Sequence, residues 1–403
     1  MSLLLEGIKV IDCASFIAGP AAATVMADFG ADVVKIEPPG IGDTFRNSRN
    51  APGNPASEVN YGWVLDNRSK RGIELDLKDP AGREVLHRLV AGADVFITNT
   101  PLPSRARLKT RYEDLAALNP RLIYASLTAY GESGPEAGNP GFDSTALWAR
   151  SSLMDMVRPY PDAPPARSLP GMGDHPTAMS LFGAIMAGLY RRERTGEGAH
   201  VHTSLMANGV WWQGFQVQAM LSGAEFKRRP PREESASALH NLYETRDGRW
   251  FHLVLIPEDR HWGALLEAIE RPEIGADQRF ASREARHANA RTLIALLDEA
   301  FGCHDWAHWK PTFERLRLPY GLVNTLRDIP EDEQMLAADV LTPIEDARAG
   351  ADHVVNSPLW IAQAPKRKPA LAPELGEHTE EVLREAGYDA AGIAALREAG
   401  AIP

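Results

Sequence analysis

The amino-acid sequence predicts an α/β fold, in which helices cover both faces of a parallel β-sheet, followed by a smaller α+β domain. Two observations support this prediction. Short apolar runs alternate with helical stretches from residue 8 to residue 126, and strand–helix–strand repeats at this close spacing form parallel sheets. The composition then changes at residues 226–237, a charged and proline-containing stretch that is typical of a boundary between domains.

The elements of the first domain follow from apolar runs that glycine and proline interrupt. An alanine-rich helix is expected between Pro20 and Phe29, because Gly30 stops it and a new apolar run begins at Val33. Trp211 and Trp212 lie in a long predicted helix and are more typical of a core or an interface than of a cofactor site. Strands are predicted at 8–12, 33–36, 71–77, 94–98, 121–126 and 200–204, and the other helices at 80–91, 112–118, after Pro176, and over 205–221.

The second domain is expected to begin with a β-hairpin. Arg246-Asp-Gly-Arg249 carries a D-G turn signal between two predicted strands, 242–245 and 250–255. From Pro319 the chain becomes extended, and Lys366-Arg-Lys368 within it is interpreted as a solvated loop. Helices are predicted at 258–269, 289–300 and 305–316, and two short helices end the chain, the first of them starting near His378 or Thr379.

Composition and charge exclude several classes of function. The 403 residues are 44% hydrophobic and 24% charged, as in an ordinary globular protein, and the formal charge of −11 argues against nucleic acid or an anionic membrane as a partner. Cys13 and Cys303 are the only cysteines, which fits a reducing cytoplasm. There is neither a signal peptide nor an apolar run long enough for a membrane span, and no histidine spacing indicates a metal site.

The expected sheet is Rossmann-like, but the motifs that accompany nucleotide or serine chemistry are missing. The first strand is followed by Ser15-Phe-Ile-Ala-Gly-Pro20, which lacks the glycine fingerprint of a dinucleotide site. No nucleophile elbow of the G-x-S-x-G kind is present either. Carboxylate chemistry remains, with Asp143 and Asp174 both on glycine-bearing turns.

Asp174 is the most informative of these carboxylates. Gly171 and Gly173 precede it, and Pro176 stands where the first residue of a helix is expected, since its fixed φ suits that position. Two interpretations stay open from the residues alone. Asp174 caps the helix, as aspartate often does, or it reacts with an acyl group that approaches along the glycine-flexed turn.

An ordered series of motifs along nearly the whole chain identifies a family resemblance. The chain resembles the class III CoA-transferases, a family that includes formyl-CoA transferase and carnitine CoA-transferase and is related to α-methylacyl-CoA racemase. The motifs are Leu5-Glu-Gly-Ile-Lys-Val-Ile-Asp12, Ala18-Gly-Pro20, Gly30-Ala-Asp-Val-Val-Lys-Ile-Glu37, Asn67-Arg-Ser-Lys-Arg-Gly-Ile-Glu-Leu-Asp-Leu-Lys78, Leu118-Asn-Pro-Arg-Leu-Ile123, Gly131-Glu-Ser-Gly-Pro135, Pro140-Gly-Phe-Asp143, Gly173-Asp174, Arg194-Thr-Gly-Glu-Gly198 and Leu375-Gly-Glu-His-Thr-Glu-Glu-Val-Leu383.

The resemblance implies a catalytic mechanism. Asp174 is the expected nucleophile, with the amides around Gly173 stabilising the oxyanions, and the reaction passes through an aspartyl anhydride and an aspartyl-CoA thioester. Coenzyme A is thereby a substrate, carried as a thioester, and no permanently bound cofactor is expected. The residues that the resemblance places at the CoA and acyl site are Ile17, Leu75, Asp76, Leu77, Lys78, Asn99, Thr100, Arg107, Phe142 and Asp143.

The resemblance also implies an assembly and a domain order. Members of the family form interlocked homodimers, in which each chain threads through its partner. The expected domains are a large domain at 1–224, a small α+β domain at 225–325, and a C-terminal return at 326–403 that completes the large domain.

Departures from the family pattern narrow the expected reaction. Phe142 occupies the position of the histidine that racemases use, and phenylalanine cannot accept a proton, so transfer is favoured over racemisation. The glycine tetrad of formyl-CoA transferase is missing, which disfavours formyl and oxalyl substrates. A small dicarboxylate such as succinate is expected by analogy, with Arg158, Arg167 and His175 as the cations that flank the site in sequence. The alternatives are a racemase-type proton exchange and a non-catalytic CoA-binding protein.

Overall fold

The computed structural model describes residues 2–51, 54–226 and 228–403. Four residues lie outside the described part of the chain, namely Met1, Pro52, Gly53 and Lys227. Lys227 belongs to the predicted boundary stretch 226–237, so one position of that stretch is not described. The chain divides into two compact units. Unit 1 comprises the chain up to residue 154 together with 167–224 and 333–403, and unit 2 comprises 155–166 and 225–332.

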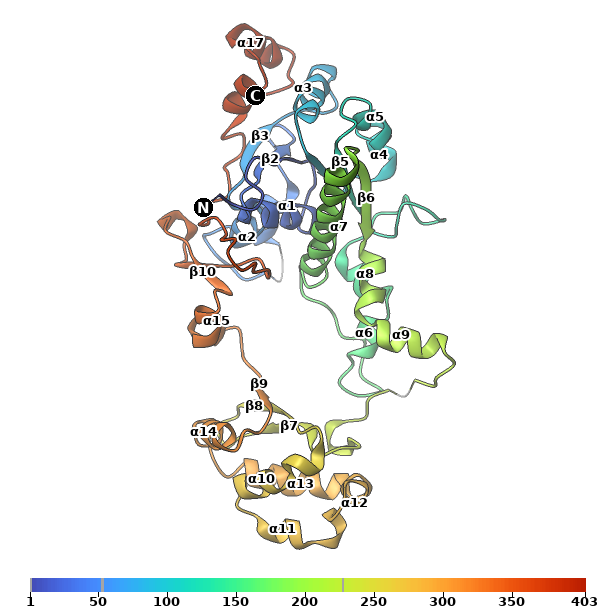
Figure 1. The fold of residues 1–403 in the computed structure, drawn as a ribbon, viewed down its shortest axis with the longest axis vertical. Helices are drawn as coiled ribbons and strands as arrows, with labels where there is room; N and C mark the ends of the chain where they lie inside the picture. Colours follow the sequence, from blue (N-terminus) through green and yellow to red (C-terminus); the bar gives the residue numbers. More distant parts are fainter. Residues whose placement is uncertain (1, 52–53, 227) are drawn as a thin grey trace. The chain divides into compact units, whose positions relative to one another are not determined.

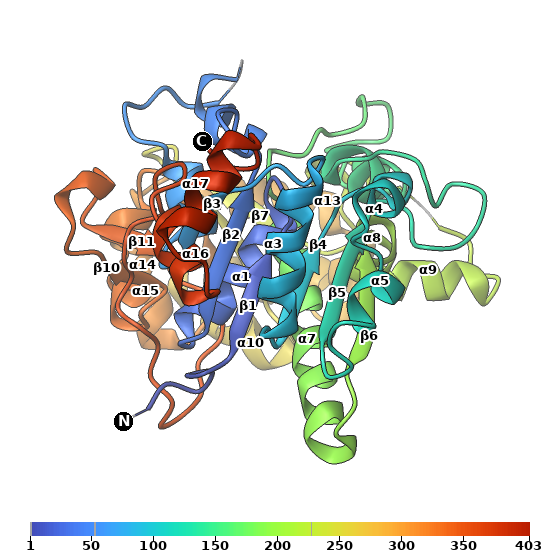
Figure 2. The ribbon, with the colours of Figure 1, turned by 90° about the horizontal axis from the view of Figure 1, so that it is seen from above.

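Unit 1 is built on the parallel sheet that the sequence predicts (Figures 1 and 2). Its six strands lie in the order β3-β2-β1-β4-β5-β6, which is the strand order of doubly wound dinucleotide-binding sheets. The direction of winding reverses between β1 and β4, which are parallel neighbours with Ile11 opposite Phe96. The strands are β1 (Lys9–Asp12), β2 (Asp32–Glu37), β3 (Arg71–Glu74), β4 (Val95–Thr98), β5 (Ile123–Thr128) and β6 (Ala199–Ser204).

Alternating side chains divide the apolar residues of this sheet between two cores. In β5, Ile123 and Ala125 pack on one face with helices α1 and α7, while Tyr124 packs on the other face with α3, α5, α16 and α17. Helices on both faces explain why the strands read as continuous apolar runs. The helices of unit 1 include α1 (Ala18–Asp28), α2 (Tyr61–Asn67), α3 (Pro80–Ala91), α4 (Leu102–Leu108), α5 (Tyr112–Ala116), α7 (Asp174–Thr195), α8 (Leu205–Trp212), α9 (Gly214–Leu221), α15 (Glu333–Ala337), α16 (Thr379–Glu385) and α17 (Ala390–Glu398), and α6 (Leu153–Met156) lies where the chain passes into unit 2.

Two predicted elements differ from the structure. The single helix predicted over 205–221 is wrong, because the chain leaves helical geometry at Gln213 (φ −102°, ψ 24°), just before Gly214 starts α9. Glycine lacks the helix propensity that would carry the helix through this point. Strand β3 also ends at Glu74 rather than at residue 77, because the Asp76 amide turns away to donate to the carbonyl of Ala401, at 2.9 Å.

Unit 2 contains an antiparallel sheet in the order β7-β8-β9, covered by helices. The predicted hairpin is confirmed: Glu244 pairs with Trp250, and Gly248 takes the positive φ of 76° that the turn between them requires. An aromatic core that includes Phe251, Phe301 and Phe313 holds the unit together. Its elements are β7 (His240–Glu244), β8 (Trp250–Val254), β9 (Tyr320–Leu322), α10 (Glu258–Ala268), α11 (Pro272–Ala276), α12 (Arg283–Ala288), α13 (Ala290–Phe301) and α14 (Trp306–Leu316).

The C-terminal segment returns to unit 1 and completes it. Strands β10 (Leu341–Pro343) and β11 (His353–Val355) form a separate antiparallel pair. Further on, Val382 and Leu383 of α16 pack in the same core as Ile73 of β3. Within the described residues, no helix combines the length and the apolar character that a membrane crossing needs.

Candidate active site

A cavity of about 490 Å³ opens where the winding of the sheet reverses, at the carboxyl ends of β1 and β4. This is the place where α/β sheets bind their ligands. The side-chain amide of Asn99, after β4, fixes the turn after β1: its oxygen accepts from the Ser15 amide at 2.9 Å and its nitrogen donates to the Ser15 carbonyl at 2.7 Å. Asn99 therefore holds two strand ends together at the floor of the cavity.

The cavity brings together residues that lie far apart in the sequence. The turn after β1, the loop 137–143 and the start of α7 all contribute to its wall. Six of the residues predicted for the site line it, namely Ile17, Asn99, Thr100, Phe142, Asp143 and Asp174. Gly173, the other predicted catalytic residue, directly precedes Asp174, and its amide donates to Asp143.

Asp174 is the first residue of α7, a helix of 22 residues, and Gly173 is its N-cap residue. No side-chain hydrogen bond caps this helix, so Asp174 does not act as the cap that one interpretation of the sequence suggested. Pro176 is the third helical residue rather than the first, which is still within the turn whose N–H groups have no intrahelical partner. The positive end of the helix dipole therefore lies beside the Asp174 carboxylate.

Gly173 makes a contact that only glycine permits. Its amide donates to Oδ2 of the buried Asp143 at 3.1 Å. A Cβ atom on Gly173 would lie 2.8 Å from the Cβ of Asp143 and 3.0 Å from a methyl group of Leu147. The glycine thus lets the π-helix Asp143–Ala149 pack directly against the start of α7. Because the Gly173 amide is already paired, it is not free to donate to an oxyanion.

The environment of Asp174 disfavours its charge. Burial raises the pKa of the Asp174 carboxyl, and the neighbouring Asp143 raises it further, to about 7, while His175 acts in the opposite direction. At neutral pH the carboxylate is then incompletely ionised. A strongly shifted carboxyl group in a cavity is typical of a functional site.

His175 and Asp66 form a pair that the sequence analysis did not find. Nε2 of His175 lies 2.9 Å from Oδ1 of Asp66, whose side chain is 2% exposed. Burial lowers the pKa of His175, but the hydrogen bond and charge of Asp66, with a smaller contribution from Asp174, raise it above its usual value. The ring lines a different cavity, an apolar one of about 510 Å³.

Buried lysines hold this part of the sheet in place. Nζ of Lys70 donates to Oδ2 of Asp12 at 2.8 Å and also to the carbonyls of Pro20 and Asp66. Burial lowers the pKa of Lys70 to about 8 although Asp12 opposes this shift. No sequence spacing could reveal this hydrogen-bond network. Its members come from β1, α1, α2 and the residue just before β3, and only the fold brings these elements together.

Two exposed aromatic rings face each other at the cavity. The rings of Phe16 and Phe142 meet edge to face, with centroids 5.6 Å apart. Phe16 has a positive φ of 64°, which is rare for a bulky residue and is typical of a constrained functional turn. Its amide donates to Asp43, which the buried Lys35 also contacts at 2.9 Å. The sequence analysis placed Phe142 at the site and missed Phe16.

The remaining residues predicted for CoA binding do not line the cavity. Leu75 is buried in the core of the sheet, and the carbonyls of Leu77 and Lys78 accept from Arg83. The Asp76 carboxylate accepts from the Lys78 amide at 2.8 Å. Lys78 and Arg107 are exposed side chains that follow β3 and lie in α4, respectively, so both are accessible to an anion in solvent.

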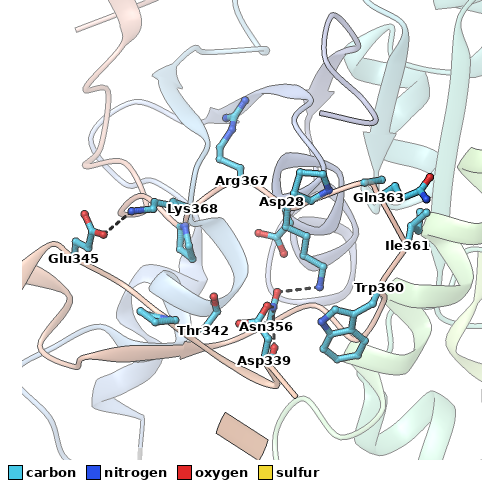
Figure 3. Close-up of a pocket in the computed structure, with 15 residues that line it drawn as sticks. Asp28, Asp339, Thr342, Glu345, Asn356, Trp360, Ile361, Gln363, Arg367 and Lys368 are labelled. Atoms are coloured by element: carbon cyan, nitrogen blue, oxygen red, sulfur yellow. Dashed lines mark hydrogen bonds and ion pairs between the residues drawn. The ribbon is translucent and has the colours of Figure 1, made fainter. Parts of the chain in front are cut away.

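A third cavity, of about 690 Å³, contains the basic cluster 366–368 (Figure 3). The interpretation of this cluster as a solvated loop holds for Lys368, which is exposed and paired with Glu345 at 2.7 Å. It is wrong for Lys366, whose partly buried Nζ donates to Asn356 at 3.0 Å and lies 4.6 Å from the ring centre of Trp360. The cations are thus used within the protein. No cluster of metal-ligating side chains occurs among residues 2–51, 54–226 and 228–403.

Comparison with known proteins places the chain among enzymes that act on CoA thioesters. The sequence pattern of CoA-transferase family III matches residues 5–379. A (R)-2-hydroxy-4-methylpentanoate CoA-transferase of Clostridioides difficile is 32% identical over 395 residues, which cover 96% of each chain. A succinyl-CoA:glutarate CoA-transferase of Homo sapiens is 29% identical over 399 residues, 99% of this chain and 90% of that one. A crystal structure of a CAIB/BAIF family protein from Brucella suis superimposes with a TM-score of 0.83, at 28% identity, over 96% of this chain and 100% of that chain.

Proposed function

The chain belongs to CoA-transferase family III and is a CoA-transferase (EC 2.8.3), and from that premise we propose that Asp174 is the nucleophile that moves CoA from an acyl-CoA to a free carboxylic acid. The observation that carries this assignment is the position of Asp174. Its uncapped carboxyl lies at the first residue of α7, in the wall of the cavity at the reversal of the sheet.

The proposed reaction has four steps. A carboxylate oxygen of Asp174 attacks the thioester carbonyl, the C–S bond breaks, and a mixed anhydride and CoA thiolate form. The thiolate attacks the aspartyl carbonyl, which releases the donor acid and leaves an aspartyl-CoA thioester. The acceptor carboxylate then attacks this thioester and expels the thiolate, which leaves a second mixed anhydride, between Asp174 and the acceptor acid. Attack of the thiolate on the acceptor acyl carbonyl yields the new acyl-CoA and restores the Asp174 carboxylate.

The chain's own groups would tune the charge of the nucleophile. Ionised Asp174 is the reactive form, and the helix dipole of α7 together with the charge of His175 favours it, while the charge of Asp66 opposes it. Asp143 and burial oppose it, which leaves a less stabilised and more reactive anion. An oxyanion would need a backbone N–H donor at the start of α7. The amides of Gly173, His175 and Thr177 already donate to protein acceptors, and Pro176 has no N–H group. Among the described residues of this turn, the amide of Asp174 itself is therefore the available donor.

The CoA portion of the substrate would follow the carboxyl edge of the sheet. Ile17, Asn99 and Thr100 line the cavity beside Asp174 and suit the narrow pantetheine arm. Lys78 and Arg107 are exposed cations near the same edge, which suits the phosphates. Leu75, Asp76 and Leu77 would contribute only through the backbone and surface of that edge.

A homodimer is the proposed assembly. The helices α8 and α9 carry exposed apolar side chains: Trp211 is 82% exposed, Phe215 85% and Leu221 76%. A monomeric protein rarely leaves such a group uncovered. Light scattering of the purified protein tests this proposal, with a dimer mass expected at micromolar concentration and a monomer mass contradicting it.

Trapping of the intermediate tests the proposed function. The protein is incubated with acyl-CoA and hydroxylamine, and peptide mass spectrometry locates the modified carboxyl; modification at Asp174 is the expected result. We expect Asp174→Asn to lower transfer about a thousandfold or more, while Asp389→Asn, at the start of α17, keeps wild-type activity. Full activity of Asp174→Asn would exclude the mechanism. Exchange of the α-proton with deuterated solvent, without any acceptor acid, would indicate the racemase-type alternative instead.

A further inference from the structure

The charged side chains in the wall of the Asp174 cavity are all acidic among the described residues. Among the described residues that line it, the ionisable side chains are Asp143 and Asp174, and no lysine, arginine or histidine contributes. The other polar groups are neutral, from Ser15, Ser48, Asn54, Asn99, Thr100, Thr128 and Asn139. An acid bound there with its reacting carboxyl group at Asp174 therefore meets no cationic side chain of this unit.

This arrangement is unfavourable for a second carboxylate on the substrate. Such a group would lose water and face two acidic side chains without an ion pair to compensate. The cations that flank the site in sequence do not change this conclusion. Arg167 is exposed and absent from the lining, and His175 lines the other cavity, where its ring pairs with Asp66. Arg158 is committed to Asp155 within unit 2, at 2.7 Å.

The same wall is well suited to an apolar chain. Phe16 and Phe142 present their rings in edge-to-face contact, and Phe45 continues the apolar surface. The buried faces of Leu127 and Leu205 add to it. Aromatic and branched side chains around a carboxyl nucleophile select by apolar contact, since each methylene group that they remove from water favours binding.

We propose that the acyl group carried by this enzyme is that of an apolar monocarboxylic acid, branched or aromatic, and that dicarboxylic acids are discriminated against by the all-acidic charge of the cavity. The proposal rests on the proposed function, because it assumes that the acyl group reacts at Asp174. It separates two substrate classes between which family membership does not decide, since the relatives named above include one for a branched hydroxy acid and one for glutarate.

A matched pair of acids tests the proposal. In 4-methylpentanoate an isopropyl group replaces the second carboxylate of succinate with nearly the same shape, so the two acids differ chiefly in charge. Each labelled acid is incubated with its own CoA thioester, and the label that enters the thioester pool is measured by mass spectrometry. This self-exchange needs no second acid and has no thermodynamic bias. We expect exchange at least about tenfold faster, in kcat/KM, for 4-methylpentanoate than for succinate.

A variant then tests the cause. Phe142 is 59% exposed on its loop, so a polar replacement does not disturb a core. Phe142→Arg supplies the missing cation and should shift the ratio of the two rates towards succinate by about tenfold or more, whereas the control Phe142→Leu should retain the wild-type preference.

Each outcome bears on the proposal. Equal or faster exchange of succinate by the wild-type protein overturns it, and so does an unchanged ratio in Phe142→Arg, because the charge of the wall would then not set the preference. Absence of exchange with both acids, and with glutarate and 3-phenylpropanoate, overturns the proposed function itself. That result is distinguishable, because a wrong substrate class still gives exchange with one of the acids.

Discussion

Replacement of His175 by glutamine should move the pH dependence of transfer towards higher pH. His175 follows Asp174 directly at the start of α7, and its imidazole lies 2.9 Å from the buried Asp66. Glutamine keeps a hydrogen-bond donor for Asp66 but carries no positive charge. Because this charge lowers the pKa of the Asp174 carboxyl, its loss should raise that pKa above about 7.

The size of the effect follows from the geometry. The His175 side chain is 41% exposed, so solvent screens its charge and we expect a shift of about half to one pKa unit rather than the larger shifts of buried pairs. In the proposed mechanism Asp174 reacts as the anion, so activity should be lost as the pH falls through the pKa of its carboxyl. At pH 7 the ionised fraction would fall from about one half to about 10–25%, a two- to fivefold loss of kcat/KM. At a pH well above the pKa of the Asp174 carboxyl, wild type and variant should agree, since Asp174 is then ionised in both.

The assay is the pH profile of kcat/KM, which reports the ionisation of the free enzyme. The control is His202→Gln, since His202 is an exposed histidine on β6. An acid limb that stays in place in His175→Gln, or that moves to lower pH, would refute the assigned role of this histidine. A profile without any acid limb between pH 5 and 8 would refute the raised pKa of Asp174.

Four further predictions concern catalysis, stability and binding. Gly173→Ala should lower transfer by about a hundredfold, measured as kcat, because its Cβ would lie 2.8 Å from Asp143 and displace the neighbouring nucleophile. Asp174→Asn should stabilise the fold by on the order of 1–3 kcal/mol at pH 8, measured in urea titrations. The gain should shrink as the pH falls from about 7 towards 3.8. The reason is that the raised pKa of Asp174 costs folding free energy only where the carboxyl of the unfolded chain is ionised. Lys70→Met should destabilise the protein by about 3–5 kcal/mol in the same titrations, because it leaves Asp12 buried without its ion pair. Arg107→Ala should raise the KM for acyl-CoA without changing kcat, and the difference should shrink at high salt; a rise independent of salt would contradict a phosphate contact.

The sequence by itself determined the layers of the fold and predicted Asp174 as the reactive residue. Strands and helices in unit 1 were predictable because helices on both faces of a parallel sheet impose long apolar runs with turn residues between them, and helix 80–91 has the predicted bounds. Asp174 was identifiable because its glycine-rich turn stands within an ordered series of motifs. The break at Gln213 was not predictable from an apolar run that continues on both sides of it.

Only the tertiary structure decided what surrounds Asp174. Asp143 and Asp66 lie 31 and 108 positions away in the chain, and Phe16 still further, so no local pattern relates them to the nucleophile. Folding brings them together at the carboxyl edge of the sheet and removes water, and this raises the pKa of Asp174 and leaves its cavity acidic and apolar. The capping interpretation was excluded in the same way, because the first turn of α7 leaves the Asp174 carboxyl without a capping bond, while the nucleophilic role of Asp174 stays a prediction.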